Sequence, residues 1–172
     1  MNTTSRDQLW VSSFDTYYQC YFEELVADAL LYRWCLLDDI TKWVVAITAS
    51  GSAIAGWSLW KTEGKIAWLV IAGVSALFAI THSALGVPNR VRNWEDSKKS
   101  FATLRLDLET LRQEMAMNAN FDFDEYNSRY LELRRRYTEQ MSRVSPDTIR
   151  TRKLESSMQD LLNITIADQI QE

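Results

Sequence analysis

Residues 43–87 read WVVAITASGSAIAGWSLWKTEGKIAWLVIAGVSALFAITHSALGV and set the expected architecture of the chain. The two apolar runs in this stretch, residues 43–60 and 66–87, contain no Asp, Glu, Lys or Arg. As helices they would be roughly 27 and 33 Å long, against a hydrocarbon core of about 30 Å. Tryptophans near the ends of both runs are typical of membrane interfaces. The pattern predicts a transmembrane hairpin over residues 41–88, and a soluble apolar hairpin is the alternative.

The rest of the chain is polar. Over all 172 residues the formal net charge is −4 and the mean hydropathy is −0.25, in spite of the two apolar runs. Basic residues flank the hairpin: Arg33 and Lys42 precede it, and Arg90, Arg92, Lys98 and Lys99 follow it, whereas only Lys61 and Lys65 lie between the runs. Because basic residues near spans favour the cytoplasmic side, we expect both termini in the cytoplasm.

The expected fold is all-α. Residues 1–40 predict a cytosolic amphipathic helix, with an apolar row at Phe14, Tyr18, Tyr21, Leu25, Tyr32 and Leu36. Asp38 and Asp39 lie just ahead of the first apolar run, where acids favour the N-terminus of a new helix. An acidic ring at the mouth of a pore is the alternative role for these two acids.

Residues 89–162 predict cytosolic helices. Pro88 and Asn89 indicate a kink or a break after the hairpin. Two apolar rows follow, one at Phe101, Leu104, Leu108, Leu111 and Met115 and the other at Tyr126, Tyr130, Leu133, Tyr137, Met141 and Val144. They predict a coiled-coil-like, antiparallel pair of helices over 91–117 and 124–144. A third helix is expected after Pro146, and residues 163–172 form a tail.

Small and polar residues recur along one side of each apolar run. These pore-lining candidates are Thr48 and Ser52 in the first run and Ala72, Ser75, Ala79, His82 and Gly86 in the second. Small residues let membrane helices pack closely, so tight helix packing is the alternative to a water-filled path. Two helices cannot enclose a pore, and the pore interpretation therefore requires a homo-oligomer, for which we expect a tetramer.

His82 is the only ionisable side chain in either run. Ionisable groups inside a membrane are functional candidates, because leaving one in lipid is costly. A neutral imidazole that hydrogen-bonds a neighbouring helix is the alternative.

The sequence contains no catalytic motif. It has no phosphate-binding glycine loop, no Cys or His spacing for a metal, and no nucleophile beside a suitable base, so we expect no enzyme, cofactor or metal. Two basic clusters are the candidates for binding a phosphate-bearing ligand or a partner: Arg134, Arg135 and Arg136, and Arg150, Arg152 and Lys153. A solvated surface, or one that faces the inner leaflet, is the alternative.

The order of these parts resembles the SLATT domains, which are bacterial two-transmembrane effector modules. The resemblance covers the chain from about Tyr17 to Asp147. It lies in the segment Leu31-Tyr32-Arg33-Trp34, the short hairpin, the region with Trp94 and Leu104-Arg105-Leu106-Asp107, and residues 126–137 followed by Pro146.

The resemblance implies a pore-forming effector of antiphage defence in the bacterial inner membrane. Such an effector depolarises the membrane in response to a nucleotide or nucleic-acid signal, received directly or through the nucleotidyltransferase that makes the signal. The family has no catalytic residues to carry over. A non-conducting membrane-anchored scaffold or sensor subunit is the alternative function.

Overall fold

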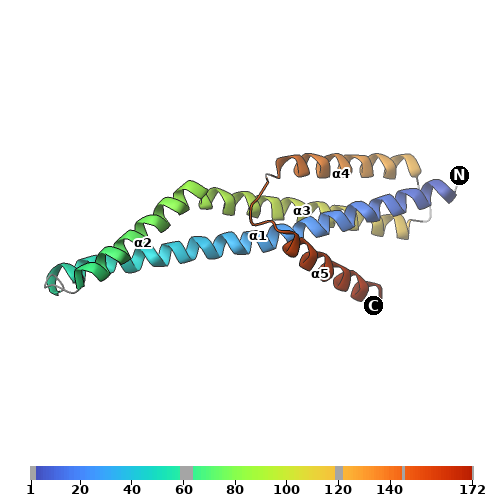
Figure 1. The fold of residues 1–172 in the computed structure, drawn as a ribbon. Helices are drawn as coiled ribbons and strands as arrows, with labels where there is room; N and C mark the ends of the chain where they lie inside the picture. Colours follow the sequence, from blue (N-terminus) through green and yellow to red (C-terminus); the bar gives the residue numbers. More distant parts are fainter. Residues whose placement is uncertain (1–2, 59–63, 119–121, 145, 172) are drawn as a thin grey trace. The chain divides into compact units, whose positions relative to one another are not determined.

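The computed structural model describes residues 3–58, 64–118, 122–144 and 146–171. Within these ranges the side chains of residues 3–4, 48–58, 64–69, 71–72 and 169–171 lie outside the description. Five α-helices and no strand are present in the described ranges: α1 (Thr3–Ser58), α2 (Gly64–Leu85), α3 (Val87–Met117), α4 (Phe123–Arg143) and α5 (Arg152–Gln171) (Figure 1). The expectation of an all-α fold is confirmed.

The chain divides into two compact units. Unit 1 comprises Met1–Leu30 and Trp94–Glu172, and unit 2 comprises Leu31–Asn93. Helix α1 is continuous from Thr3 to Ser58, so the prediction that Asp38 and Asp39 begin a new helix is wrong. Acids at these positions do not interrupt the helix, because no Pro or Gly breaks its hydrogen bonds there.

The core of unit 1 forms where α1, α3 and α4 meet. Leu9, Tyr17 and Cys20 of α1 pack with Leu104, Leu108, Leu111 and Met115 of α3 and with Tyr126 and Tyr130 of α4. The apolar row that the sequence predicts on α3 is therefore confirmed. Ion pairs at the surface show that α3 and α4 are antiparallel, because Glu114 contacts Arg129 while Asp107 contacts Arg136. The predicted helix pair is thus present, and α1 is its third partner.

Polar contacts accompany this packing along α1 and α3. Lys98 Nζ lies 2.6 Å from Asp28 Oδ1, and Arg105 Nε lies 2.6 Å from Glu24 Oε2. Nearer the N-terminus, Arg112 donates a hydrogen bond to the carbonyl oxygen of Trp10 and its guanidinium lies over the indole ring. The order of these contacts shows that α1 and α3 also run antiparallel within unit 1.

The predicted apolar row of α1 is wrong in its C-terminal half. Tyr32 and Leu36 are 69% and 47% exposed, whereas Leu30 and Trp34 are buried. Further toward the N-terminus, the buried face includes polar residues, namely Ser13, Thr16 and Glu23. A pattern of apolar residues does not identify these positions as buried, because their side chains are polar. Each has a hydrogen-bond partner, which lowers the cost of burying it.

Helices α2 and α3 are separated at Gly86, which adopts a positive φ of 59°. Only a residue without a Cβ adopts this conformation without strain, so Gly86 ends α2 in the manner of a helix C-terminal glycine. Pro88 lies in the first turn of α3, where its missing N–H is not needed. A break is present as predicted, but it falls at Gly86, beyond the end of α2, and not at Pro88 and Asn89, which lie inside α3.

Helix α4 begins as the sequence predicts. Asp122 is its N-cap, and its carboxylate accepts hydrogen bonds from the backbone N–H groups of Asp124 and Glu125. This contact satisfies donors that a helix leaves unpaired in its first turn.

In the part of the chain that the structure describes, no helix has an apolar stretch long enough to cross a membrane. Side chains of the first predicted span from residue 48 onward, and those of residues 66–69, 71 and 72 in the second, lie outside that part.

Candidate functional site

A cluster of three polar side chains lies in unit 2. His82 Nε2 of α2 lies 2.8 Å from Asp38 Oδ1 of α1, and Lys42 Nζ lies 2.5 Å from Asp38 Oδ2. The Asp38 and His82 side chains are 16% and 22% exposed. Each oxygen of the carboxylate thus has its own partner, and one of these partners lies 44 residues away along the chain.

The surroundings of Asp38 favour its charged form. Hydrogen bonds from Lys42 and then from His82 lower the pKa of the Asp38 carboxyl below its usual value. A carboxylate that remains ionised gives His82 a charged acceptor. His82 therefore has the hydrogen-bonded partner that an ionisable group on an apolar helix requires.

The other predicted pore-lining residues differ in burial where their side chains are described. Ser75 is buried, with 8% exposure, whereas Ala79 is exposed. Gly86 lies in the turn after α2. Thr48, Ser52 and Ala72 lie outside the described side chains. The structure therefore brings His82 together with Asp38, an acid that the sequence analysis places just ahead of the first apolar run. Whether the predicted residues line one pore stays a prediction.

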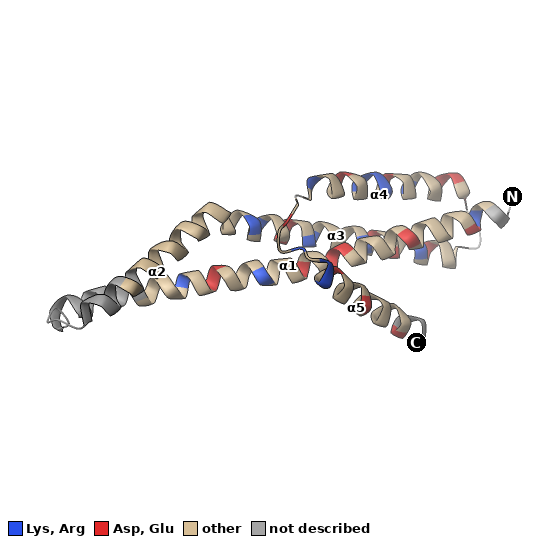
Figure 2. Ribbon diagram, in the orientation of Figure 1, with Lys and Arg blue, Asp and Glu red and all other residues tan. Residues whose placement is uncertain are grey.

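Large apolar side chains point outward from both helices of unit 2. On α1 the exposed ones are Tyr32, Leu36, Leu37, Ile40, Trp43, Val45 and Ile47, and on α2 they are Val70, Val74, Leu77, Phe78, Ile80 and Leu85. Figure 2 shows no charged residue on the described part of α2. Surfaces with this much exposed apolar area normally contact lipid or another protein.

Half of the residues in the two basic clusters are engaged in ion pairs, namely Arg135, Arg136 and Arg150. Arg135 contacts Glu132 and Glu139, and Arg136 Nη1 lies 2.9 Å from Asp107 Oδ2. Within the described ranges, three of the six predicted ligand-binding residues make no ion pair: Arg134, Arg152 and Lys153.

Arg150 is partly buried in unit 1, with a side chain that is 20% exposed. Its guanidinium donates two hydrogen bonds of 2.9 and 3.0 Å to Glu23 and one of 2.7 Å to Glu155. Burial acts to lower the pKa of Arg150, but the hydrogen bonds to Glu23 and Glu155 outweigh it and raise that pKa above its usual value. Arg150 therefore fastens the segment before α5 to α1.

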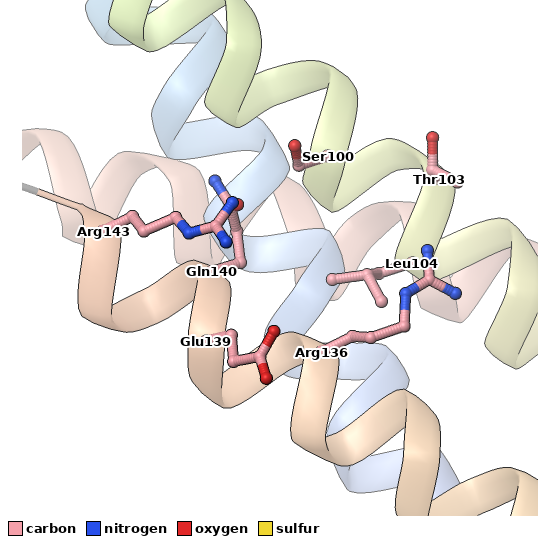
Figure 3. Close-up of a pocket in the computed structure, with 7 residues that line it drawn as sticks. All are labelled: Ser100, Thr103, Leu104, Arg136, Glu139, Gln140 and Arg143. Carbon is pink, nitrogen blue, oxygen red and sulfur yellow. The ribbon is translucent and has the colours of Figure 1, made fainter.

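A polar groove lies between α3 and α4 of unit 1 (Figure 3). Its volume is about 260 Å³, and its lining consists of Ser100, Thr103, Leu104, Arg136, Glu139, Gln140 and Arg143. Sequence reasoning identified Arg136 and missed Arg143. No local signal marks Arg143, because the residues that complete the groove belong to α3, roughly forty positions earlier.

Comparison with known proteins gives no family assignment, since no family model, curated protein or solved structure matches the chain. Among the described side chains, no group of three or more His, Cys, Asp or Glu residues could hold a metal ion.

Proposed function

We propose that the chain is a membrane effector of bacterial antiphage defence. The hairpin of residues 43–60 and 66–87 inserts into the inner membrane with both termini in the cytoplasm. Several copies, four as the first number to test, assemble around one axis and enclose a conducting path. The protein acts by depolarising the membrane and carries out no catalysis.

The observation that carries this proposal is the distribution of side chains in unit 2. Large apolar residues point outward from α1 and α2, while Ser75, Asp38 and His82 are shielded. Lipid is a favourable environment for the outer side chains, and polar groups within a membrane need a protein partner or water. The absence of charge from residues 43–60 and 66–87 supports the same arrangement.

The proposal includes control by a nucleotide or nucleic-acid signal, because an effector that opens a membrane must remain closed until it is needed. A signal shifts such an equilibrium only if it binds one state better than the other. Unit 1 is the water-facing part available to receive the signal. It holds Arg134, Arg152 and Lys153, which make no ion pair among the described residues. A partner such as the enzyme that makes the signal is the alternative route of control.

Conductance of the full chain in planar bilayers tests the proposal. We expect channel events from the unaltered protein, and we expect Ser75→Leu to reduce them, because a bulky residue would fill a shielded position. Val74→Leu is the matched control, since Val74 is 45% exposed and its replacement should leave conductance unchanged.

Two results would contradict the proposal. Failure of the chain to insert into vesicles would remove the membrane role. Native mass measurement in detergent that finds only monomers would remove the pore. Insertion without conductance would support the alternative, a non-conducting scaffold or sensor subunit.

A further inference from the structure

We infer that the groove between α3 and α4 is a binding site for a compact oxyanion, namely a phosphate monoester group. The idea that a control signal binds in this groove rests on the proposed function. The idea that the groove binds an anion does not rest on it, since binding requires no conduction.

The groove has positive groups on one wall and neutral donors on both. Arg136 and Arg143 extend from α4 toward α3, as Figure 3 shows. Within the described ranges, the side chains of Arg143, Gln140 and Ser100 make no hydrogen bond or ion pair with another residue. Buried Leu104 lies beneath these polar groups. Guanidinium groups and neutral N–H or O–H donors arranged around a small space match the several acceptor oxygens of a phosphate.

The acidic residues near the groove do not cancel this charge. The Glu139 carboxylate accepts a hydrogen bond from Arg135, which lies outside the groove. Arg136 uses one of its N–H groups for Asp107, and both partners of this pair are 41% exposed. Because exposed ion pairs contribute little, the remaining donors of Arg136 are available to a ligand.

A second groove between the same two helices has the opposite chemistry. It is lined by Asp107, Thr110, Ser128, Arg129, Glu132 and Leu133. Its two carboxylates outnumber its one arginine and oppose an anion, whereas the Arg136–Arg143 groove has two arginines and one carboxylate. The contrast indicates that the Arg136–Arg143 groove differs from an ordinary gap between helices by its accumulation of donors.

Titration of the full-length protein in detergent tests the site. The probes are inorganic phosphate, adenosine monophosphate, adenosine as the uncharged control, and a short-chain phosphatidic acid that presents the same group on a lipid. We expect saturable binding of the phosphate-bearing probes, no binding of adenosine, and weaker binding as salt screens the charges. Preference for the nucleotide or for the lipid identifies the source of the phosphate.

Three variants locate the binding. We expect Arg143→Gln to lower the affinity at least about tenfold, in line with the loss of a charge-assisted hydrogen bond. Gln140→Glu, which keeps the shape of the side chain and adds a negative charge, should abolish binding. Arg129→Gln is the matched control, because Arg129 is an exposed arginine of the same helix that lines the second groove and not this one, and it should keep the affinity within a factor of about two.

The inference is overturned if the unaltered protein binds neither phosphate nor the phosphate esters, or if Arg143→Gln and Arg129→Gln bind equally well. Conductance recorded with and without the nucleotide separates the two proposals. Binding that leaves conductance unchanged supports the site and contradicts its role in control. A conducting protein that binds no anion keeps the proposed function and loses the site.

Discussion

Replacing Arg150 with methionine should destabilise unit 1 more than any other loss of a single charge among the described ion pairs. Arg150 is the common partner of Glu23 and Glu155, and the Glu23 side chain is only 7% exposed. Methionine fills a similar volume but donates no hydrogen bond. The substitution therefore leaves the Glu23 carboxylate buried without its two charged donors.

The expected cost follows from that burial. Removing one partner of a buried ion pair destabilises a protein by about 3–5 kcal/mol. Domains are stable by about 5–15 kcal/mol in total, so the variant should lose a large part of its stability. Arg135→Met is the matched control, because Arg135 also has two glutamate partners but is 60% exposed. Its loss should cost at most about 1 kcal/mol.

Urea denaturation of the full chain in mild detergent, followed by circular dichroism, measures both variants. The double variant Glu23→Leu/Arg150→Met should recover most of the loss, because it removes the stranded carboxylate as well as the arginine. The reasoning is refuted if Arg150→Met unfolds within about 1 kcal/mol of Arg135→Met. It is also refuted if the double variant is no more stable than Arg150→Met.

Three further predictions concern single residues. Burial raises the pKa of the Cys20 thiol to about 12, so a maleimide at neutral pH should label half-buried Cys35 and modify Cys20 only after unfolding, as mass spectrometry would show. Gly86→Ala should lower the melting temperature, since the positive φ costs an alanine about 1 kcal/mol, whereas Gly73→Ala within α2 should not lower it. Burial also raises the pKa of Tyr137 from 10.0 to about 12. The stability that comes from keeping this hydroxyl neutral is complete below pH 10.0 and is lost as the pH rises toward about 12. In urea titrations at alkaline pH, Tyr137→Phe should therefore lose less stability than the unaltered protein.

The sequence predicted the elements whose signals are local. The row that includes Phe101 and Leu108 is buried in α3, and α4 begins at Phe123, one residue before the predicted start. Apolar spacing and capping act over a few residues, so they can be identified without knowledge of the rest of the fold. The break between α2 and α3 at Gly86, two residues before the predicted Pro88, belongs to the same class of signal.

The features that escaped prediction depend on distant partners. Nothing near Asp38 indicates that it contacts His82, and nothing near Arg150 indicates that it pairs with the buried Glu23. Charge runs are usually solvated, so the sequence analysis predicted Arg150 to be a surface residue that could bind a ligand. Arg143 was missed for a related reason, because the groove exists only once α3 and α4 lie side by side.

The polar contacts between α1 and α3 in unit 1 have a consequence for the uniqueness of the fold. The apolar residues of α3 recur at every third or fourth position, so sliding α3 by one turn along α1 would still bury much of the same surface. Such a slip moves each charged group by about 5.4 Å, which separates Arg105 from Glu24 and Lys98 from Asp28. The exposed Lys98–Asp28 pair adds little to stability by itself, but together with the largely shielded Arg105–Glu24 pair it selects one register among several of similar burial. Neutralising both acids should therefore produce a bundle with mixed registers, while most of its helix content remains.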